Sequence, residues 1–533
     1  MKELVLSELS MEQRIGMLLC ATLPFHGEED VEYALQLIRE HKLGGVYIGL
    51  TFGGRKRAVE RVLEAADYPI LVMCDAERGY PGHFIPQTIS LSAAGENEEY
   101  AYSFGRVTAT LCRQDGYNIM NSPNVDFCGS NFPCGTTSRI ISPKTDVTCR
   151  LAAAVARGMR DGGILPSAKH YPSPRQSKKY DSHMREGFAT DTLEDIKRDS
   201  LVAYRHLHDT GLLDSIMVGH KLMPNIDPNR PASLSKPVMD IFREEGYDGL
   251  YVSDSLGMMG VVLKYGYIPP IPMSVIAGCD LALPWTVHCR EAYEALLAAW
   301  RDGSLSEERI NEACRRVLEA QHKAAMLPKD AELREEDLEN IRRINEECIS
   351  ARCAEGYTPS ISKDGKHLFV IMTDGKEELD QQEYDIFSAS WYSAHRIDEK
   401  LRATFPNSGT FGLPQYPTAQ QNFALFTEQT KYDDVVFITY TNSEAFAGRE
   451  HLTSRFVDMM DALQSTDKVA AHMHFGNPFV ATDAPYVPRV IMGWANGDCI
   501  IHAIDILAGD APVLGTQPYE DILKFHEKGY EFD

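Results

Sequence analysis

Between residue 40 and about residue 325, short apolar runs alternate with longer segments of helical periodicity, and this alternation limits the chain to few folds. Seven apolar runs are predicted to be strands: 45–49, 70–75, 118–121, 163–170, 216–220, 250–254 and 279–283. Helical patterns lie between them at 55–66, 96–114, 147–160, 193–208, 237–245 and 289–301. Strands that alternate with helices at this interval indicate a parallel sheet with right-handed crossovers.

Polar residues follow several of these strands and are not confined to one pair of neighbours. They are Asp75, Lys169 with His170, His220, and Asp254. In a closed barrel the carboxyl ends of all strands surround one mouth, whereas in an open doubly wound sheet they lie along an edge. We therefore predict an α/β fold that begins with a (β/α)8 TIM-like barrel, although the pattern locates only seven of its strands.

The alternation is interrupted by a charged helical stretch and then resumes. At 533 residues the chain is long enough for two domains. The acids of 331–338 are expected to form a solvated face. Further apolar runs at 368–372, 435–440, 469–475 and 490–492 predict a smaller open α/β sandwich. The predicted organisation is a barrel domain over 1–326, a helical linker over 327–355 and a C-terminal α/β sandwich domain over 356–533.

Composition excludes several classes of partner. The formal net charge of −24 at pH 7 opposes binding to nucleic acids and anionic membranes. The start of the chain lacks the apolar core of a signal peptide, and Ser10 with Glu12 indicates instead a helix that reaches about Leu19. No apolar run in the sequence is long enough to span a membrane. We expect a cytoplasmic protein whose twelve cysteines are mostly reduced and buried.

No nucleotide-binding motif is present in the sequence, and no cofactor is expected. Neither GxGxxG nor GxxxxGK[ST] occurs. His472 and His474 share one face of a predicted strand, but two ligands are too few for a structural metal site, so packing is the favoured interpretation.

The run 163–172 ends in Lys169-His170 and continues through a polar loop to Asp181 and His183. A carboxylate two positions before a histidine can hold one ring nitrogen, fix the tautomer and raise the pKa of the imidazole. Such a pair can move a proton, although an isolated Asp-x-His is most often an ordinary surface pair. Asp254, at the end of its strand, either caps the next helix or acts as a nucleophile. A carboxylate opposite a proton shuttle is the minimum set for retaining glycoside hydrolysis.

An ordered succession of motifs resembles glycoside hydrolase family 3, and more narrowly the two-domain form of its β-N-acetylglucosaminidase (β-hexosaminidase) branch. The motifs are Asp75-Ala76-Glu77-Arg78-Gly79, Ile85-Pro86-Gln87, Ser122 to Asp126, Ala168 to Pro172, Asp181-Ser182-His183, Met217 to His220, Pro231 to Ser235 and Ser253 to Leu256. Gly476-Asn477-Pro478 and Leu507-Ala508-Gly509 resemble the second domain of such proteins.

The resemblance implies roles for individual residues. Asp254 corresponds to the nucleophile, and His183 to the acid/base with Asp181 as its partner. The residues implied to bind sugar hydroxyls are Asp75, Lys169 and His170, with His220 close by. Most of the family takes its acid/base from a carboxylic acid of the second domain, so the Asp-His pair points to N-acetylated sugars.

Two departures from the family pattern affect the substrate. Ser173-Pro174-Arg175-Gln176 replaces the usual Gly-His-Gly-Asp, and Thr137 stands where an arginine is expected, with Arg139 two residues on. Arg139 is therefore a candidate sugar ligand. Arg175, with two lysines after it, suggests an anionic group on the substrate, unless these are simply solvated loop charges.

The first hypothesis is an exo-acting, retaining β-N-acetylglucosaminidase that forms a glycosyl-aspartate and serves cell-wall recycling. Its substrate would be a small saccharide, either a β-N-acetylglucosaminide or a muropeptide fragment, and a homodimer is left open. The alternatives are a β-N-acetylglucosaminide phosphorylase, a β-glucosidase of the same family, and a sugar-binding protein that has lost catalysis.

Overall fold

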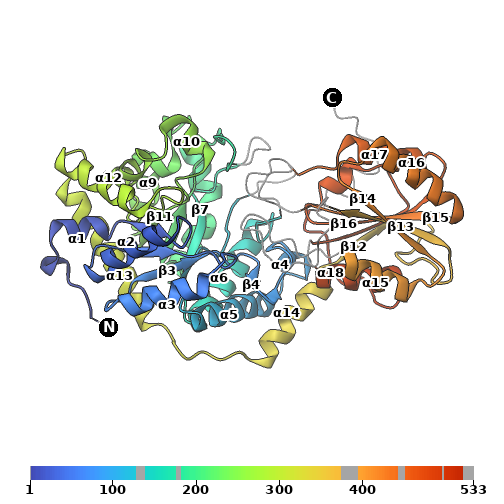
Figure 1. Ribbon diagram of the computed structural model, residues 1–533, viewed down its shortest axis with the longest axis horizontal. Coiled ribbons are helices and arrows are strands. Elements are labelled where there is room, and N and C mark those ends of the chain that lie inside the picture. Colours follow the sequence, from blue (N-terminus) through green and yellow to red (C-terminus); the bar gives the residue numbers. More distant parts are fainter. Residues whose placement is uncertain are drawn as a thin grey trace. The chain divides into compact units, whose positions relative to one another are not determined.

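The computed structural model describes residues 2–127, 138–175, 182–373, 394–441, 450–494 and 497–519. They fall into two compact units, of which the first is mostly blue to yellow-green in Figure 1 and the second mostly orange to red. The first unit comprises Met1–His83, Glu98–Gly129 and Ile140–Asn340, and the second Phe84–Asn97, Ser130–Arg139 and Ile341–Asp533. The predicted boundaries at 326 and 355 stay predictions.

The first unit is built on a seven-stranded sheet in which every neighbouring pair is parallel. Its strands, in spatial order, are β1 (Cys20–Thr22), β2 (Gly45–Tyr47), β3 (Leu71–Cys74), β6 (Ile119–Met120), β7 (Leu165–Tyr171), β8 (Ser215–Val218) and β11 (Leu250–Ser253). Almost all strand residues are buried, as expected when both faces of a parallel sheet are covered.

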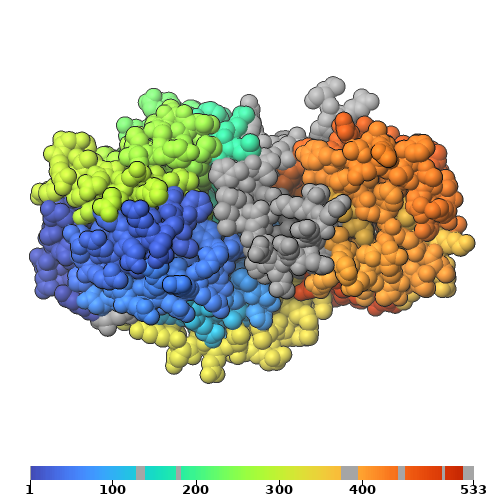
Figure 2. Space-filling view, viewed as in Figure 1, coloured from blue at the N-terminus to red at the C-terminus, as the bar shows by residue number. Residues whose placement is uncertain are grey.

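Helices cover the outside of this sheet (Figure 1), and Figure 2 shows them as a continuous surface of blue and green atoms. They include α2 (Glu28–Arg39), α3 (Arg55–Ala65), α5 (Glu98–Gln114), α6 (Thr145–Asp161), α9 (Lys236–Arg243), α12 (Cys289–Arg301) and α13 (Glu307–Met326). Helix α9 buries Val238, Met239, Ile241 and Phe242, one apolar face at helical spacing. Helices α5 and α6 approach closely because Gly105 has no side chain: a Cβ there would lie 2.2 Å from the Val155 carbonyl oxygen.

The predicted strands and helices of this unit are largely confirmed, with three differences. The opening helix α1 (Met11–Gly16) ends before Leu19, and β1 follows it. The predicted helix 193–208 is divided into α7 (Leu193–Asp195), a π-helical turn and α8 (Val202–Asp209). The run 279–283 is not an extended strand, but Leu281 and Ala282 form single parallel bridges with Val252 and Leu19.

The second unit contains a mixed sheet of six strands. Their order is β12 (Ser350–Cys353), β17 (Arg489–Gly493), β16 (Val469–Phe475), β15 (Asp434–Tyr440), β13 (His367–Thr373) and β14 (Gly409–Pro414), with only β12 antiparallel to its neighbour. Helices cover both faces (Figure 1): α16 (Ala419–Glu428) and α17 (Ser454–Gln464) on one side, α15 (Ala394–Thr404) and α18 (Gly497–Leu507) on the other. The four predicted strands are confirmed.

The charged stretch at the end of the first unit leads into α14 (Glu335–Glu347). Its acids do not all face solvent, which corrects the prediction. Asp337 is buried and accepts hydrogen bonds from Arg106 and Ser103, each at 2.8 Å. Burial of this carboxylate is tolerated because the arginine supplies the opposite charge.

The histidine pair of β16 is packed within the second unit. His472 and His474 both contact the Thr439 hydroxyl, at 2.7 and 2.9 Å, and burial lowers the pKa of His474 to about 4.

No cluster of metal-ligating side chains occurs among the described residues. Nine of the ten cysteines within the described ranges are buried. In that same part of the chain, no helix combines the length and the apolar character that crossing a membrane requires.

Candidate active site

Side chains that follow the carboxyl ends of five neighbouring strands form the candidate site in the first unit. They are Asp75 after β3, Asp126 after β6, Lys169 and His170 at the end of β7, His220 after β8 and Asp254 after β11. Because the five strands are parallel and adjacent, their carboxyl ends share one edge of the sheet. The parallel order thus places these side chains along one edge of the sheet, and their convergence on the mouth of a closed barrel stays a prediction.

Lys169 holds two carboxylates at one end of this site. Its Nζ lies 2.8 Å from Asp75 Oδ1 and 3.1 Å from Glu77 Oε2, and its side chain is only 4% exposed. The Tyr47 hydroxyl donates to the other oxygen of Asp75 at 2.8 Å. Asp75 is fixed from two sides yet 40% exposed, so it can still accept a hydrogen bond from a ligand hydroxyl.

His170 is oriented by Asp126, a residue for which the sequence predicts no role. Asp126 accepts hydrogen bonds from His170 Nδ1 at 2.9 Å and from the His170 backbone N–H at 3.1 Å. Burial acts to raise the pKa of the Asp126 carboxyl, but His170 beside it prevails and holds the pKa well below its usual range. This leaves Nε2 as the ring nitrogen of His170 that a ligand can meet. The motif Ser122 to Asp126 is recognisable in the sequence, but the pairing of Asp126 with His170 is not.

Asp254 lies directly after β11 and is surrounded by imidazoles. The Ser255 backbone N–H donates to Asp254 Oδ1 at 2.7 Å. Burial acts to raise the pKa of Asp254, but His220, His170 and His183 outweigh it and lower the pKa below its ordinary value. The carboxyl is thus kept ionised, the state that a nucleophile requires.

His220 supports the loop that carries Asp254. Its Nε2–H donates to the Ser255 carbonyl at 2.8 Å, and its Nδ1 accepts from the Ser233 hydroxyl at 2.6 Å. Burial lowers the pKa of His220, in keeping with the neutral tautomer that these two partners require. Because both ring nitrogens have protein partners, His220 positions the loop, and its role as a sugar ligand stays a prediction.

His183 reaches the neighbourhood of Asp254 on a loop that is docked on α10 (Met259–Tyr265). The Met259 N–H donates to the His183 carbonyl at 3.0 Å, and the Gly260 N–H donates to the Ser182 carbonyl at 3.3 Å. A Cβ on Gly260 would lie 2.9 Å from the Ser182 oxygen and 3.0 Å from the Arg185 oxygen. The helix that follows Asp254 along the chain thus holds the loop that contains Ser182 and His183. Asp181, the predicted partner of His183, lies outside the described residues.

The two predicted arginine ligands have different surroundings. Arg175 pairs with Asp199 at 2.5 Å and lies 5.5 Å from the centre of the Phe127 ring. Arg139 is half-buried and belongs to the second unit. Both assignments stay predictions, and Arg175 shares its partner Asp199 with Arg198, which lies 2.8 Å from the same carboxylate.

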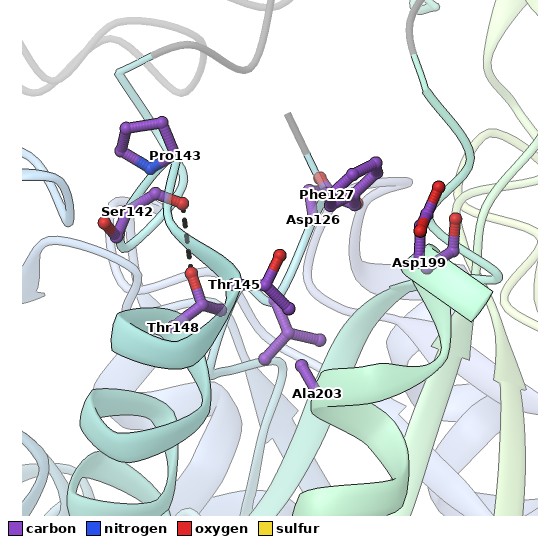
Figure 3. A pocket seen from close by; sticks show the side chains of 10 residues that line it. Asp126, Phe127, Ser142, Pro143, Thr145, Thr148, Asp199 and Ala203 are labelled. Atoms are coloured by element: carbon purple, nitrogen blue, oxygen red, sulfur yellow. Dashed lines mark hydrogen bonds between the residues drawn. The ribbon is translucent and has the colours of Figure 1, made fainter. Parts of the chain in front are cut away.

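A pocket is lined on one side by Asp126 and Phe127 (Figure 3). The start of α6 and the segment from Asp199 to Ala203 form its other walls, and the Thr148 hydroxyl donates to the Ser142 carbonyl at 3.0 Å within it. Asp199, on the wall opposite α6, is the carboxylate that pairs with Arg175.

The sequence of this chain matches a family model over more than half of its length. Residues 10–320 match the family model "Glycosyl hydrolase family 3 N terminal domain". A β-N-acetylglucosaminidase/β-glucosidase of Cellulomonas fimi is 25% identical over 331 residues, which are 59% of this chain and 57% of that protein. A β-hexosaminidase of Tolumonas auensis is 28% identical over 262 residues, 46% of this chain and 77% of that one.

A solved structure extends the similarity of fold to nearly the whole chain. The glycoside hydrolase family 3 β-N-acetylglucosaminidase from Paenibacillus sp. str. FPU-7 superposes with a TM-score of 0.79 at 23% identity. The superposition covers 95% of this chain and 98% of that chain.

Proposed function

Since this chain belongs to glycosyl hydrolase family 3, we propose that it is a retaining β-N-acetylglucosaminidase that removes terminal β-N-acetylglucosamine from small saccharides. Family membership makes it a glycoside hydrolase. The preference for the acetylated sugar is supported by the name of the Tolumonas protein, a β-hexosaminidase, whereas the Cellulomonas protein is named for both β-N-acetylglucosaminidase and β-glucosidase activity. The observation that carries the proposal is Asp254, an ionised carboxylate among three histidines at the end of β11.

In the proposed reaction the Asp254 carboxylate attacks the anomeric carbon while His183 protonates the departing oxygen. The product of this step is a covalent glycosyl-aspartate. His183, now deprotonated, takes a proton from water, and the hydroxyl oxygen of that water displaces the aspartate. An imidazole suits the place beside Asp254 because its deprotonated form is neutral and adds no second negative charge near the nucleophile. Asp181 would orient the ring, which stays a prediction from the sequence.

The other side chains of the site would bind and orient the sugar. Asp75, held by Lys169 and Tyr47, would accept hydrogen bonds from ring hydroxyls. Lys169 would donate to the same hydroxyls, and His170 would offer Nε2, since Nδ1 is engaged by Asp126. Charged groups that are fixed before the substrate arrives can orient it at little further entropic cost.

We also propose that the sheet closes as a (β/α)8 barrel, with residues 280–283 in the eighth position. Leu281 bridges Val252 of β11, and Ala282 bridges Leu19 beside β1. Backbone hydrogen bonds join the same segments: Cys20 N–H donates to the Ala282 carbonyl at 2.9 Å, and Ser253 N–H to that of Leu281 at 3.0 Å.

One assay compares this function with its alternatives. Release of nitrophenol is measured from the β-N-acetylglucosaminide and from the β-glucoside, each with and without inorganic phosphate. We expect cleavage of the acetylated glycoside and no acceleration by phosphate, with Asp254→Asn nearly inactive but folded. Phosphate-dependent formation of a sugar 1-phosphate would make the protein a phosphorylase, and preference for the plain glucoside would make it a β-glucosidase. Full activity of Asp254→Asn would contradict the mechanism.

A further inference from the structure

Trp285 has an unusual backbone conformation next to the candidate active site. Its φ of 49° lies in the left-handed region, which costs a residue other than glycine on the order of 1 kcal/mol. Two hydrogen bonds hold the loop: His26 Nε2–H donates to the Trp285 carbonyl at 2.9 Å, and Thr286 N–H donates to that of Pro284 at 2.7 Å. Strain that surrounding contacts maintain is found most often where a ligand is clamped.

The Trp285 indole is backed by other aromatic rings. Its centre lies 4.9 Å from the Tyr47 ring, 5.8 Å from Phe52 and 6.1 Å from Phe25. Tyr47 and Phe52 are buried, whereas Trp285 is half-buried and Phe25 is 38% exposed. The buried rings thus fix the indole in place, while part of it stays accessible to a ligand.

Contacts join Trp285 to both carboxylates of the site. Tyr47, which packs against the indole, donates its hydroxyl hydrogen to Asp75. On the other side, the Leu256 N–H donates to the Leu283 carbonyl at 2.9 Å, and a Cβ on Gly257 would lie 2.6 Å from Thr286 Oγ1. The Trp285 loop therefore touches the nucleophile loop just after Asp254, and its indole adjoins the support of Asp75.

From these contacts we infer that Trp285 is a substrate-binding residue, whose indole packs against the terminal sugar ring held between Asp75 and Asp254. The C–H face of a pyranose is apolar, and the face of an indole carries partial negative charge that attracts C–H groups. Binding sites for small molecules combine such an apolar wall with a few fixed polar groups, which here are Asp75 and Lys169. The inference rests on the proposed function, because the ligand is the terminal sugar of the proposed substrate.

Intrinsic fluorescence tests the inference without turnover. The chain has four tryptophans, and Trp300 on the outer helix α12 is also half-buried, which makes it a matched control. N-Acetylglucosamine should change the fluorescence of the wild-type protein and of Trp300→Phe, but not that of Trp285→Phe. A sugar-dependent change that persists in Trp285→Phe would overturn the inference.

Kinetic measurements distinguish a contact of Trp285 with the terminal sugar from a contact with the leaving group. Trp285→Ala removes one aromatic contact to the terminal sugar and should raise KM about tenfold. The increase should be the same on a nitrophenyl glycoside and on a disaccharide, because both present the same terminal sugar. Trp285→Phe, which keeps an aromatic face and confirms that the loop still folds, should stay within about threefold of wild type. An effect of Trp285→Ala on the nitrophenyl glycoside alone, or on neither substrate, would contradict the inference. If wild-type protein cleaves no acetylated glycoside but its Trp285 fluorescence responds to the sugar, the proposed function fails and this inference stands.

Discussion

Replacement of Gly260 by alanine tests whether α10 holds in place the loop of Ser182 and His183, the proposed acid/base. The new methyl group would lie 2.9 Å from the Ser182 carbonyl oxygen and 3.0 Å from that of Arg185, closer than a carbon and a backbone oxygen can rest. The loop must therefore move away from the helix. Its two hydrogen bonds to α10, at 3.0 and 3.3 Å, would be weakened or lost.

The size of the effect follows from those two bonds. Each contributes about 1 kcal/mol, so losing both disfavours the docked loop by about 2 kcal/mol. At 1.36 kcal/mol for each factor of ten, the rate of the acid-catalysed step should fall by up to about 30-fold. The loss should depend on the leaving group, because a good leaving group departs with little help from an acid.

The assay measures kcat/KM on aryl β-N-acetylglucosaminides whose phenols span a range of acidity. Gly260→Ala should be strongly impaired on the least acidic phenols and close to wild type on the most acidic. Gly187→Ala is a matched control on the same loop, since its Cβ would meet only Lys221 Cγ at 3.7 Å. An equal loss across all leaving groups would indicate a general disturbance of the fold and refute the reasoning, as would no loss at all.

Three further outcomes are expected. Asp280 is fully buried and pairs with Arg243, Arg309 and Arg316. Asp280→Ala should therefore lower the free energy of unfolding by roughly 3–5 kcal/mol, measured by urea denaturation with circular dichroism. A decrease below about 1 kcal/mol would contradict this prediction. Neighbouring imidazoles lower the pKa of Asp254, so kcat/KM should fall on the acid side only below the ordinary carboxyl pKa of about 3.9. In His170→Gln this fall should move to higher pH, because one imidazole that lowers the pKa is lost. An unchanged pH profile would show that His170 does not act on Asp254. Arg175→Ala should change kcat/KM equally on neutral and anionic glycosides, because the Arg175 guanidinium is already engaged by Asp199. A loss confined to anionic substrates would restore Arg175 as an anion ligand.

The sequence predicted most of the fold because the pattern of buried residues is periodic. Of the six helical segments predicted between the strands of the first unit, five agree with the observed helices to within two residues at each end, since each carries an apolar face at helical spacing. Two strands of the second sheet were missed for local reasons. Strand β14 contains two glycines and a proline, and β12 lies in a stretch whose charge resembles a linker.

The site was only partly accessible from the sequence. Strand-end polar residues such as Asp75, Lys169 and Asp254 could be found because a parallel sheet brings strand ends together. The pairing of Asp126 with His170, the docking of Ser182 and His183 on α10, and the aromatic support of Trp285 depend on tertiary contacts between distant segments. No spacing along the chain encodes such contacts.

The central proposal is that Asp254 forms a covalent bond with the sugar, and mass spectrometry measures this directly. The protein is incubated with a ring-fluorinated N-acetylglucosaminyl fluoride, which forms the glycosyl-enzyme quickly and loses it slowly, and is then digested and sequenced. The proposal predicts a sugar adduct on the peptide that contains Asp254, with no adduct in Asp254→Asn. An adduct on another carboxylate, or turnover that releases the α-anomer as its first product, would contradict it.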